Sequence, residues 1–198
     1  LNVIVTMGDG GLGIGGAHVL AACRRNLDIT LIILNNFNFG MTGGQYSATT
    51  PTNAVVGSEF LNQAEVPIDI CSIAESAGAT FIARCSGLDK DLPEKICQAV
   101  RHKGFSVIET LGMCTGRYTK KNRLSPKILD QLTASLPARS GIVEKNIRPE
   151  YGKRYRELAR ERDIFPMPVS IEKKINLTDY QNQQVAILGS AGMRIVTA

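Results

Sequence analysis

Two short polar motifs, each directly following an apolar stretch, constrain this chain more than any other feature. A Gly-Asp-Gly sequence at 8–10 and an Asn pair at 35–36 each close a predicted strand. Asp9 and Asn36 are 27 positions apart, about one strand–helix–strand unit. Neighbouring parallel strands end at the same edge of a sheet, so a carboxylate and an amide oxygen can meet there. Hard oxygen ligands beside a glycine turn suit a Mg²⁺ ion that holds a diphosphate.

Strand-like and helix-like patterns alternate along the first half of the chain. Helical stretches between strands imply βαβ units with right-handed crossovers, and so an α/β fold with a doubly wound parallel sheet. A loop over 36–67 is too long for a simple connection and is expected to be functional. The predicted strands are 2–7, 29–34, 80–83 and 105–109, and the predicted helices are 14–25, 69–77, 91–102, 124–136 and 151–162.

Composition narrows the class of protein. Hydrophobic residues make up 43% of the 198 residues, which is a globular composition. No apolar run reaches the roughly 20 residues of a membrane span, so no membrane association is expected. The five cysteines form no CxxC pair, which favours a reducing compartment, here the cytoplasm. The first residue is Leu and lies directly on a strand, which suggests a fragment.

The formal net charge is +5, and many of the basic residues lie between 148 and 162. Acidic residues are interleaved with them, which indicates a solvated helix with i,i+4 pairs or a face that docks an acidic protein. The run has little aromatic interleaving, so no nucleic-acid partner is expected.

The segment 8–13 also matches G-x-G-x-x-G, the turn that binds dinucleotides. A nicotinamide-dependent dehydrogenase would place an acid at the end of the second strand, where this chain has asparagines. Without a metal, Asp9 would repel a pyrophosphate. The metal–diphosphate interpretation is therefore favoured over the dehydrogenase and over a glycine turn with a solvated Asp9.

A longer run, GDGGLGIGGAHVLAACRRNLDITLIILNNFNFGMTGGQYSATTP, resembles the thiamine-diphosphate-binding β subunit of 2-oxoacid:ferredoxin oxidoreductases, in particular the 2-oxoglutarate type. The similarity continues through GATFIARC and HKGFSVIETLGMCTGR and returns at RPEY. The resemblance implies a thiamine-diphosphate-binding fold of the pyrophosphate-domain type.

The resemblance also implies a set of site residues. Mg²⁺ would be bound by Asp9, by the side chain of Asn36 and by the main-chain carbonyl of Asn38. His18 occupies the family's histidine position, although a plain core histidine is the alternative. The implied cofactor-binding residues are Gly8, Asp9, Gly10, Gly11, His18, Asn36, Asn38, Thr42, Gly43, Gly44 and Gln45.

The implied activity is oxidative decarboxylation of a 2-oxoacid, with the acyl group passing to coenzyme A and the electrons to ferredoxin. Family members work with an α subunit that carries the pyrimidine domain and supplies the activating glutamate, so we expect a hetero-oligomer and assign no catalytic residue. Cys114 matches one cysteine of the family's [4Fe–4S] cluster, which needs four thiolates. The cluster is expected only if further sequence supplies the others. An inactive structural or docking remnant is the non-enzyme alternative.

Three regions are expected along the chain: a thiamine diphosphate and Mg²⁺ domain at 1–115, a helical extension and linker at 116–180, and an incomplete domain at 181–198. The last stretch contains VAILGSAGMRIVTA, which is similar to the opening of the family's γ subunit.

Overall fold

A computed structural model describes residues 2–162. Its sheet has the strand order β1-β2-β4-β3-β5. The first four strands are parallel, and β5 pairs antiparallel with β3. The predicted doubly wound parallel α/β fold is therefore confirmed, with one short antiparallel strand added at the edge. The strands are β1 (Val3–Gly8), β2 (Ile29–Asn35), β3 (Phe81–Ser86), β4 (Ser106–Leu111) and β5 (Ser140–Ile142).

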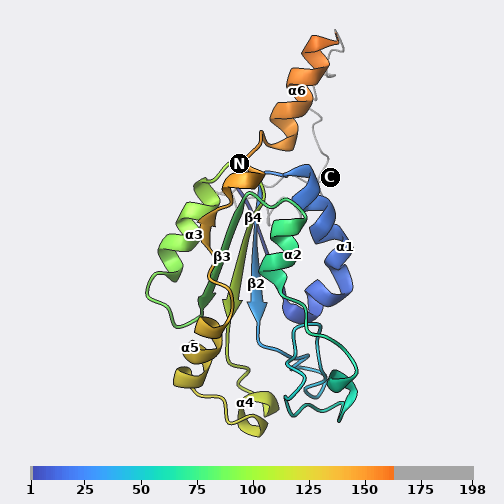
Figure 1. Ribbon diagram of the computed structural model, residues 1–198, viewed down its shortest axis with the longest axis vertical. Helices are drawn as coiled ribbons and strands as arrows, with labels where there is room; N and C mark the ends of the chain where they lie inside the picture. Colours follow the sequence, from blue (N-terminus) through green and yellow to red (C-terminus); the bar gives the residue numbers. More distant parts are fainter. Residues whose placement is uncertain (1, 163–198) are drawn as a thin grey trace, which may run out of the picture. The chain divides into compact units, whose positions relative to one another are not determined.

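Helices cover both faces of the sheet (Figure 1). Buried side chains of α1 and α2 pack on one face, and those of α3 pack on the other. Because β3 and β4 have neighbours on both sides and helices on both faces, every residue in them is buried. The helices are α1 (Asp9–Arg25), α2 (Ile70–Ser76), α3 (Leu92–Arg101), α4 (Arg117–Lys121), α5 (Pro126–Ser135) and α6 (Tyr151–Glu161), with 3₁₀ turns at Leu61–Gln63 and Glu144–Asn146.

Helix α1 begins at Asp9, five residues earlier than the sequence pattern predicts. Glycines are poor helix formers, and five of them at positions 10–16 disguise this part of the helix. Packing of Leu12, Val19 and Cys23 against the sheet supplies the stability that local propensity lacks. The early start matters for the site, because it places Asp9 in the first turn of the helix.

The segment between β2 and α2 is the predicted long loop. It contains only a 3₁₀ turn and two isolated bridges, Phe39 with Gln45 and Val56 with Glu59. Buried Asn62 donates to the carbonyl oxygens of Pro51, Thr52 and Ala54 at 3.0–3.1 Å. Figure 1 shows this loop at the end of the sheet to which the strands point. It therefore lies beside the carboxyl ends of the parallel strands.

Arg148, the first residue of the late basic run, is not part of a solvated face. Its guanidinium donates to the carbonyl oxygens of Cys23 at 2.6 Å, Gly78 at 2.7 Å and Asn146 at 2.9 Å. The carbonyl of Cys23 lies in the last turn of α1, where a cation is favourable. The acids interleaved with the run form exposed ion pairs, Arg154 with Glu157 at 3.6 Å and Arg156 with Glu150 at 3.4 Å.

One compact unit spans Asn2–Glu157, so the segment carrying β5 and Arg148 belongs with the sheet. The division into domains at 115 and 180 stays a prediction. The part of the expected extension and linker beyond residue 162 and the γ-like segment at 181–198 lie outside the described residues. Among the described helices, none has the combination of length and apolar character that crossing a membrane requires.

Candidate functional site

The two motifs that opened the sequence analysis meet at one edge of the sheet. Strands β1 and β2 pair in parallel with Gly8 opposite Leu34, so both strands end at the same level. Asp9 follows β1 directly as the first residue of α1, and Asn36 follows β2 directly. The expected approach of a carboxylate and an amide at adjacent strand ends is present.

Three oxygen-bearing groups crowd together there. The outer amide atom of Asn36 that faces the cluster lies 2.8 Å from the carbonyl oxygen of Asn38 and 3.3 Å from Oδ1 of Asp9. If this atom is the nitrogen, it donates to both oxygens. If it is Oδ1, it accepts from the backbone N–H of Asn38 at 3.3 Å and brings three acceptors together. The first arrangement satisfies the oxygens without an ion, and a cation bound between them would satisfy the second.

The separations in this cluster suit a small cation. Octahedral Mg²⁺ holds its oxygen ligands at about 2.0–2.1 Å, which places neighbouring ligands about 2.9 Å apart. The observed separations of 2.8 and 3.3 Å bracket this value. One carboxylate, one amide oxygen and one carbonyl oxygen are also hard donors of the type that Mg²⁺ prefers. The residues present therefore fit the implied ion, with Asp9, Asn36 and Asn38 as its protein ligands.

Burial sets the electrostatics of Asp9. Its side chain is 2% exposed, and burial raises the pKa of its carboxyl group above the ordinary value of 3.8. Hydrogen bonds to the carboxylate oppose this shift: Ser47 donates a short one to Oδ2, and the Thr49 hydroxyl lies 3.4 Å from the same atom. The backbone N–H groups of Asn36 and Asp9 also hydrogen-bond the carboxylate, and Oδ1 lies 3.3 Å from the side-chain amide of Asn36. A cation beside Oδ1 would favour the ionised carboxylate.

Gly10 is required by a close approach. A Cβ at this position would lie 2.7 Å from Cδ1 and 2.9 Å from Cζ of the Phe39 ring. The N-terminal amides of α1 lie here, and such amides bind phosphate groups in other proteins. The glycine therefore allows an aromatic ring and the start of a helix to share the same edge of the site.

Gly10→Ala is expected to destabilise the chain by about 1–3 kcal/mol, because the Phe39 ring must move. Gly15→Ala is the matched control in the same helix. A Cβ there meets nothing within 4 Å, so the better helix propensity of alanine is expected to stabilise by up to about 1 kcal/mol. Urea unfolding of both variants measures the two effects, which should have opposite signs. Equal effects would show that the Phe39 contact has no energetic consequence.

The other predicted loop residues form a tight turn beside this cluster. Gly43 and Gly44 have φ angles of 117° and 82°, which favour glycine. Thr42 Oγ1 donates to Gln45 Oε1 at 2.5 Å, and Gln45 Nε2 donates back to the Thr42 carbonyl at 2.6 Å. An open cleft of about 430 Å³ runs past the turn, a size that suits a small-molecule cofactor. Its lining includes Gly13, Phe39, Thr42, Gln45, Ser47 and Glu65.

One further predicted residue, His18, lies farther from the cluster. His18 is exposed on α1, and nine residues of helix separate it from Asp9, a rise of about 13 Å. It therefore cannot contact the proposed metal and is not a buried core histidine. Gly8 directly precedes Asp9, and Gly11 follows it by two positions in the first turn of α1. An apolar cleft between α1 and α2, lined by Leu20 and Ile73 among others, has little polar lining and does not include the cluster.

Cys114 is half-buried and follows β4 at the same end of the sheet. A Cβ on Gly40 would lie 3.2 Å from Cys114 Sγ and 3.5 Å from Asn38 Oδ1, so the thiol is close to the oxygen cluster. Within residues 2–162, Cys114 belongs to no group of three or more metal-ligating side chains. The described residues therefore do not fit a [4Fe–4S] cluster.

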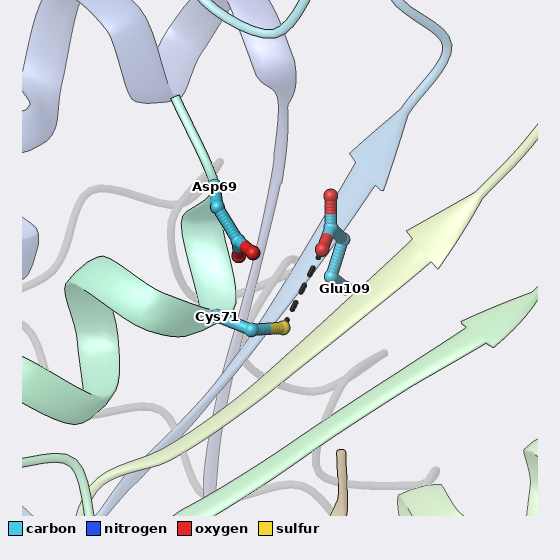
Figure 2. Close-up of side chains that lie close together, drawn as sticks. All are labelled: Asp69, Cys71 and Glu109. Atoms are coloured by element: carbon cyan, nitrogen blue, oxygen red, sulfur yellow. Dashed lines mark hydrogen bonds between the residues drawn. The ribbon is translucent and has the colours of Figure 1, made fainter. Parts of the chain in front are cut away.

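One group of potential metal ligands is already neutralised by the protein. Asp69, Cys71 and Glu109 converge between α2 and β4, as Figure 2 shows. The guanidinium of Arg84 lies between the two carboxylates, with Nε 2.7 Å from Glu109 Oε2 and a short contact from Nη2 to Asp69. Burial raises the pKa of the Cys71 thiol, which donates to Glu109 Oε2 at 3.4 Å. The positive charge of Arg84 thus neutralises the carboxylates of Asp69 and Glu109, as a bound metal ion would.

Sequence reasoning missed Ser47, Thr49 and the role of Asn35. All three are buried, and they join Asp9 to the cluster around Glu109. The signal that could have found them is the hydroxyl-rich run at 47–50, because hydroxyl groups buried in a long loop need specific partners. Arg84 and Glu109 were also visible as opposite charges on two otherwise apolar strands.

An α/β sheet with hard oxygen donors at two adjacent strand ends is the arrangement expected of a diphosphate-binding domain. Comparison with known families agrees. The sequence model of the thiamine pyrophosphate enzymes, for their C-terminal TPP binding domain, matches residues 1–110. The chain belongs to this family, and binding of thiamine diphosphate is the family's defining property.

Curated relatives confirm the narrower resemblance. The chain is 39% identical over 151 residues to the 2-oxoglutarate synthase subunit KorB of Archaeoglobus fulgidus. This match covers 75% of this chain and 55% of the relative. It is 38% identical over 116 residues to the 2-oxoglutarate oxidoreductase subunit KorB of Mycobacterium tuberculosis, covering 58% of this chain and 31% of the relative. The chain thus spans about half or less of the length of these relatives.

A solved structure shares the fold. The 2-oxoglutarate:ferredoxin oxidoreductase from Magnetococcus marinus superposes with a TM-score of 0.68 over 94% of this chain and 67% of that one. The sequence identity is 22%, so this likeness supports the fold alone.

Proposed function

We propose that this chain is the thiamine-diphosphate-binding subunit of a 2-oxoacid:ferredoxin oxidoreductase that acts on 2-oxoglutarate or a similar 2-oxoacid. The observation that carries the proposal is the meeting of Asp9, Asn36 and the Asn38 carbonyl at adjacent strand ends. The names of the relatives support the substrate class, since they are 2-oxoglutarate synthase and 2-oxoacid:ferredoxin oxidoreductase subunits.

In this proposal each group of the site has one task. Asp9, the side chain of Asn36 and the carbonyl of Asn38 would hold Mg²⁺, and the ion would neutralise charge on the diphosphate. The N–H groups of Gly10 and Gly11 at the start of α1 face the phosphate oxygens. The turn at 42–45 lines the cleft beside them. The bound cofactor supplies an electron sink that allows a 2-oxoacid to lose carbon dioxide. In this proposal coenzyme A would accept the acyl group and ferredoxin would accept the electrons.

A partner subunit is part of the proposal. The relatives are named as subunits of larger enzymes. Edge strand β1 exposes Val3, Ile4 and Val5 at 39%, 50% and 37%, and Ile14 on α1 is 83% exposed. Apolar surface of this kind on adjacent elements favours contact with another chain. An α subunit would bring the pyrimidine domain and the activating glutamate.

The dehydrogenase alternative fits the geometry less well. The position at the end of β2 that would bind a ribose hydroxyl holds Asn35, whose amide is buried and donates to Glu109 at 2.8 Å. The Asp9 carboxylate lies where a pyrophosphate without a metal would approach. Both observations favour the metal-dependent diphosphate site.

Calorimetric titration of the purified chain with thiamine diphosphate tests the proposal. Binding is expected to require Mg²⁺ and to be weak, because half of the proposed pocket comes from the partner. The isolated chain is expected to produce no carbon dioxide from 2-oxoglutarate, and adding the α subunit should tighten cofactor binding. Titration with NAD is the comparison: metal-independent NAD binding without thiamine diphosphate binding would contradict the proposal. Turnover by the isolated chain would contradict the division of labour between subunits.

A further inference from the structure

We propose that Asn35 is a positioning residue for the Asp9 carboxylate, acting through a buried chain of hydrogen bonds that begins at Glu109 and passes through Thr49. The sequence pattern treated 35–36 as one motif, yet only Asn36 lies against the carbonyl of Asn38 and Oδ1 of Asp9. This inference rests on the proposed function, because Asp9 needs an orientation only if it holds a cation.

The chain begins at a fixed carboxylate in the core. Glu109 on β4 is 3% exposed, and its Oε2 receives Arg84 Nε at 2.7 Å and the Cys71 thiol at 3.4 Å. Arg84 also forms an ion pair with Asp69, the N-cap residue of α2. Figure 2 shows Asp69 beside Cys71 and Glu109. These contacts occupy Oε2, so Oε1 is the carboxylate oxygen that faces the end of β2. Oε1 accepts from Asn35 Nδ2 at 2.8 Å.

This contact determines the orientation of the Asn35 amide. A carboxylate only accepts hydrogen bonds, so the nitrogen of Asn35 must face Glu109 and its oxygen must face the other way. There Oδ1 accepts from the backbone N–H of Phe37 at 3.1 Å and from the Thr49 hydroxyl at 2.8 Å. Asn35 is 2% exposed, so water does not compete for these bonds.

Thr49 passes this constraint to the proposed ligand. A hydroxyl has one proton, and the 2.8 Å bond to Asn35 claims it. Thr49 is therefore linked to Asp9 through Ser47: the backbone N–H of Thr49 donates to Ser47 Oγ at 3.4 Å, and the Ser47 hydroxyl donates to Asp9 Oδ2. The hydrogen bond from Thr49 to Asn35 thereby holds residues 47–49 in position beside Asp9. With Oδ2 held by Ser47, Oδ1 is the oxygen left to face Asn36.

The test measures Mn²⁺ binding to the full chain, using loss of the free-ion electron paramagnetic resonance signal, with and without thiamine diphosphate. Thr49→Val keeps the side-chain volume and removes the hydroxyl. Changes to groups that orient metal ligands typically cost 10–100-fold in metal affinity, and we expect a loss in that range. Thr49→Ser restores the hydroxyl and should return the affinity to within about threefold of wild type.

Thr110→Val is the matched control. Thr110 follows Glu109 on β4 and is buried, and its Oγ1 has no hydrogen-bond partner among residues 2–162. The same substitution there removes a hydroxyl outside the chain of bonds, so Mn²⁺ affinity should equal that of wild type. Far-ultraviolet circular dichroism and the thermal midpoint show whether each variant is folded.

Glu109→Gln probes the other end of the chain independently. Glutamine has one oxygen for two donors, Arg84 and Asn35, so one of them loses its acceptor and the Asn35 amide is no longer forced into one orientation. Mn²⁺ affinity should fall about tenfold or more. In the double variant with Thr49→Val, the loss should be no greater than the larger single loss, because both changes break one chain.

Unchanged affinity in folded Thr49→Val, or additive losses in the double variant, would overturn the inference. If Thr49→Val does not fold, the Glu109→Gln variant, produced at low temperature if necessary, takes its place in the test. Mn²⁺ binding by folded Glu109→Gln that is less than tenfold weaker than that of wild type would then overturn the inference. Failure of the wild-type chain to bind Mn²⁺ in the presence of thiamine diphosphate would instead overturn the proposed function itself. The two failures are therefore distinguishable.

Discussion

Asp9→Asn is expected to abolish Mg²⁺-dependent binding of thiamine diphosphate and to stabilise the metal-free chain. The first effect follows because Asp9 is the only carboxylate in the proposed ligand set, so its loss should exceed the roughly 100-fold upper range for groups that merely orient a ligand. The second follows because burial raises the pKa of Asp9, which means that its ionised form is unfavourable in the folded state.

The sign of the stability effect can be checked against pH. A carboxyl group whose pKa is higher in the folded chain favours folding below its unfolded pKa and loses that contribution as pH rises through the folded value. At neutral pH the metal-free wild type no longer has this favourable contribution, because its Asp9 carboxylate is ionised and buried. The Asp9→Asn variant has no charge at this position, so its stability does not fall in the same way. Scanning calorimetry at pH 4 and pH 7 without metal should therefore show a larger advantage for the variant at pH 7.

Asp91→Asn is the control for this substitution. Asp91 is exposed and makes no side-chain cap to α3, so the same change there should alter neither binding nor the thermal midpoint. If Asp9→Asn binds thiamine diphosphate and Mg²⁺ like wild type, the motif is a structural remnant rather than a cofactor site. Loss of binding together with higher stability is the signature of a residue kept for function at a cost to folding.

Arg84→Met is expected to cause the largest loss of stability, about 3–5 kcal/mol, because it leaves the carboxylates of Asp69 and Glu109 without their shared cation. The Arg84 side chain is 2% exposed, so solvent cannot replace it. For a unit of this size, each kcal/mol corresponds to roughly 2–4 °C in thermal midpoint. The midpoint should therefore fall by roughly 6–20 °C in calorimetry.

The pH dependence gives this prediction a second readout. Burial would raise the pKa of Asp69, but hydrogen bonds from the Ser72 N–H and from Arg84 outweigh it and lower the pKa below its ordinary value. A lowered pKa contributes stability at neutral pH that is lost as pH falls through the folded value. Without Arg84 much of that contribution disappears, so the variant's stability should depend less on pH in the acid range.

Lys103→Met is the matched control for Arg84→Met. Lys103 pairs with Asp28 at 3.2 Å, but its side chain is 67% exposed. Exposed pairs contribute about 0–1 kcal/mol, so this variant should remain within a few degrees of wild type. A similar small effect for Arg84→Met would show that the buried cluster, and the orientation it imposes on Asn35, has little influence on the fold.

Much of the architecture could be predicted from local pattern. Strands β1 to β4 were expected within one or two residues at most ends, because alternating apolar stretches and helical spacing are strong signals for a parallel sheet. The start of α1 was missed, since glycine-rich sequence hides a helix that tertiary packing stabilises. Strand β5 was missed because three residues carry too little pattern to be recognised.

The proposed ligands were predictable for a related reason. Asp9 and Asn36 follow strands directly, so knowledge of strand order alone places them at a shared edge. The groups that orient them were not predictable, because Ser47 and Thr49 come from a long loop whose path depends on tertiary contacts. Residue type does not indicate which of two adjacent asparagines faces the Asp9 carboxylate.

Local chemistry along the chain was thus enough for the class of fold and for a carboxylate and an amide at adjacent strand ends, since both depend on short spacings and on the period of apolar residues, whereas the cofactor followed from the family resemblance. Long-range packing alone settled which oxygens converge, that Arg84 neutralises the second acidic cluster, and that Asn35 faces Glu109 while Asn36 faces Asp9. These contacts join residues up to 74 positions apart, and their energies depend on burial, which no local window contains.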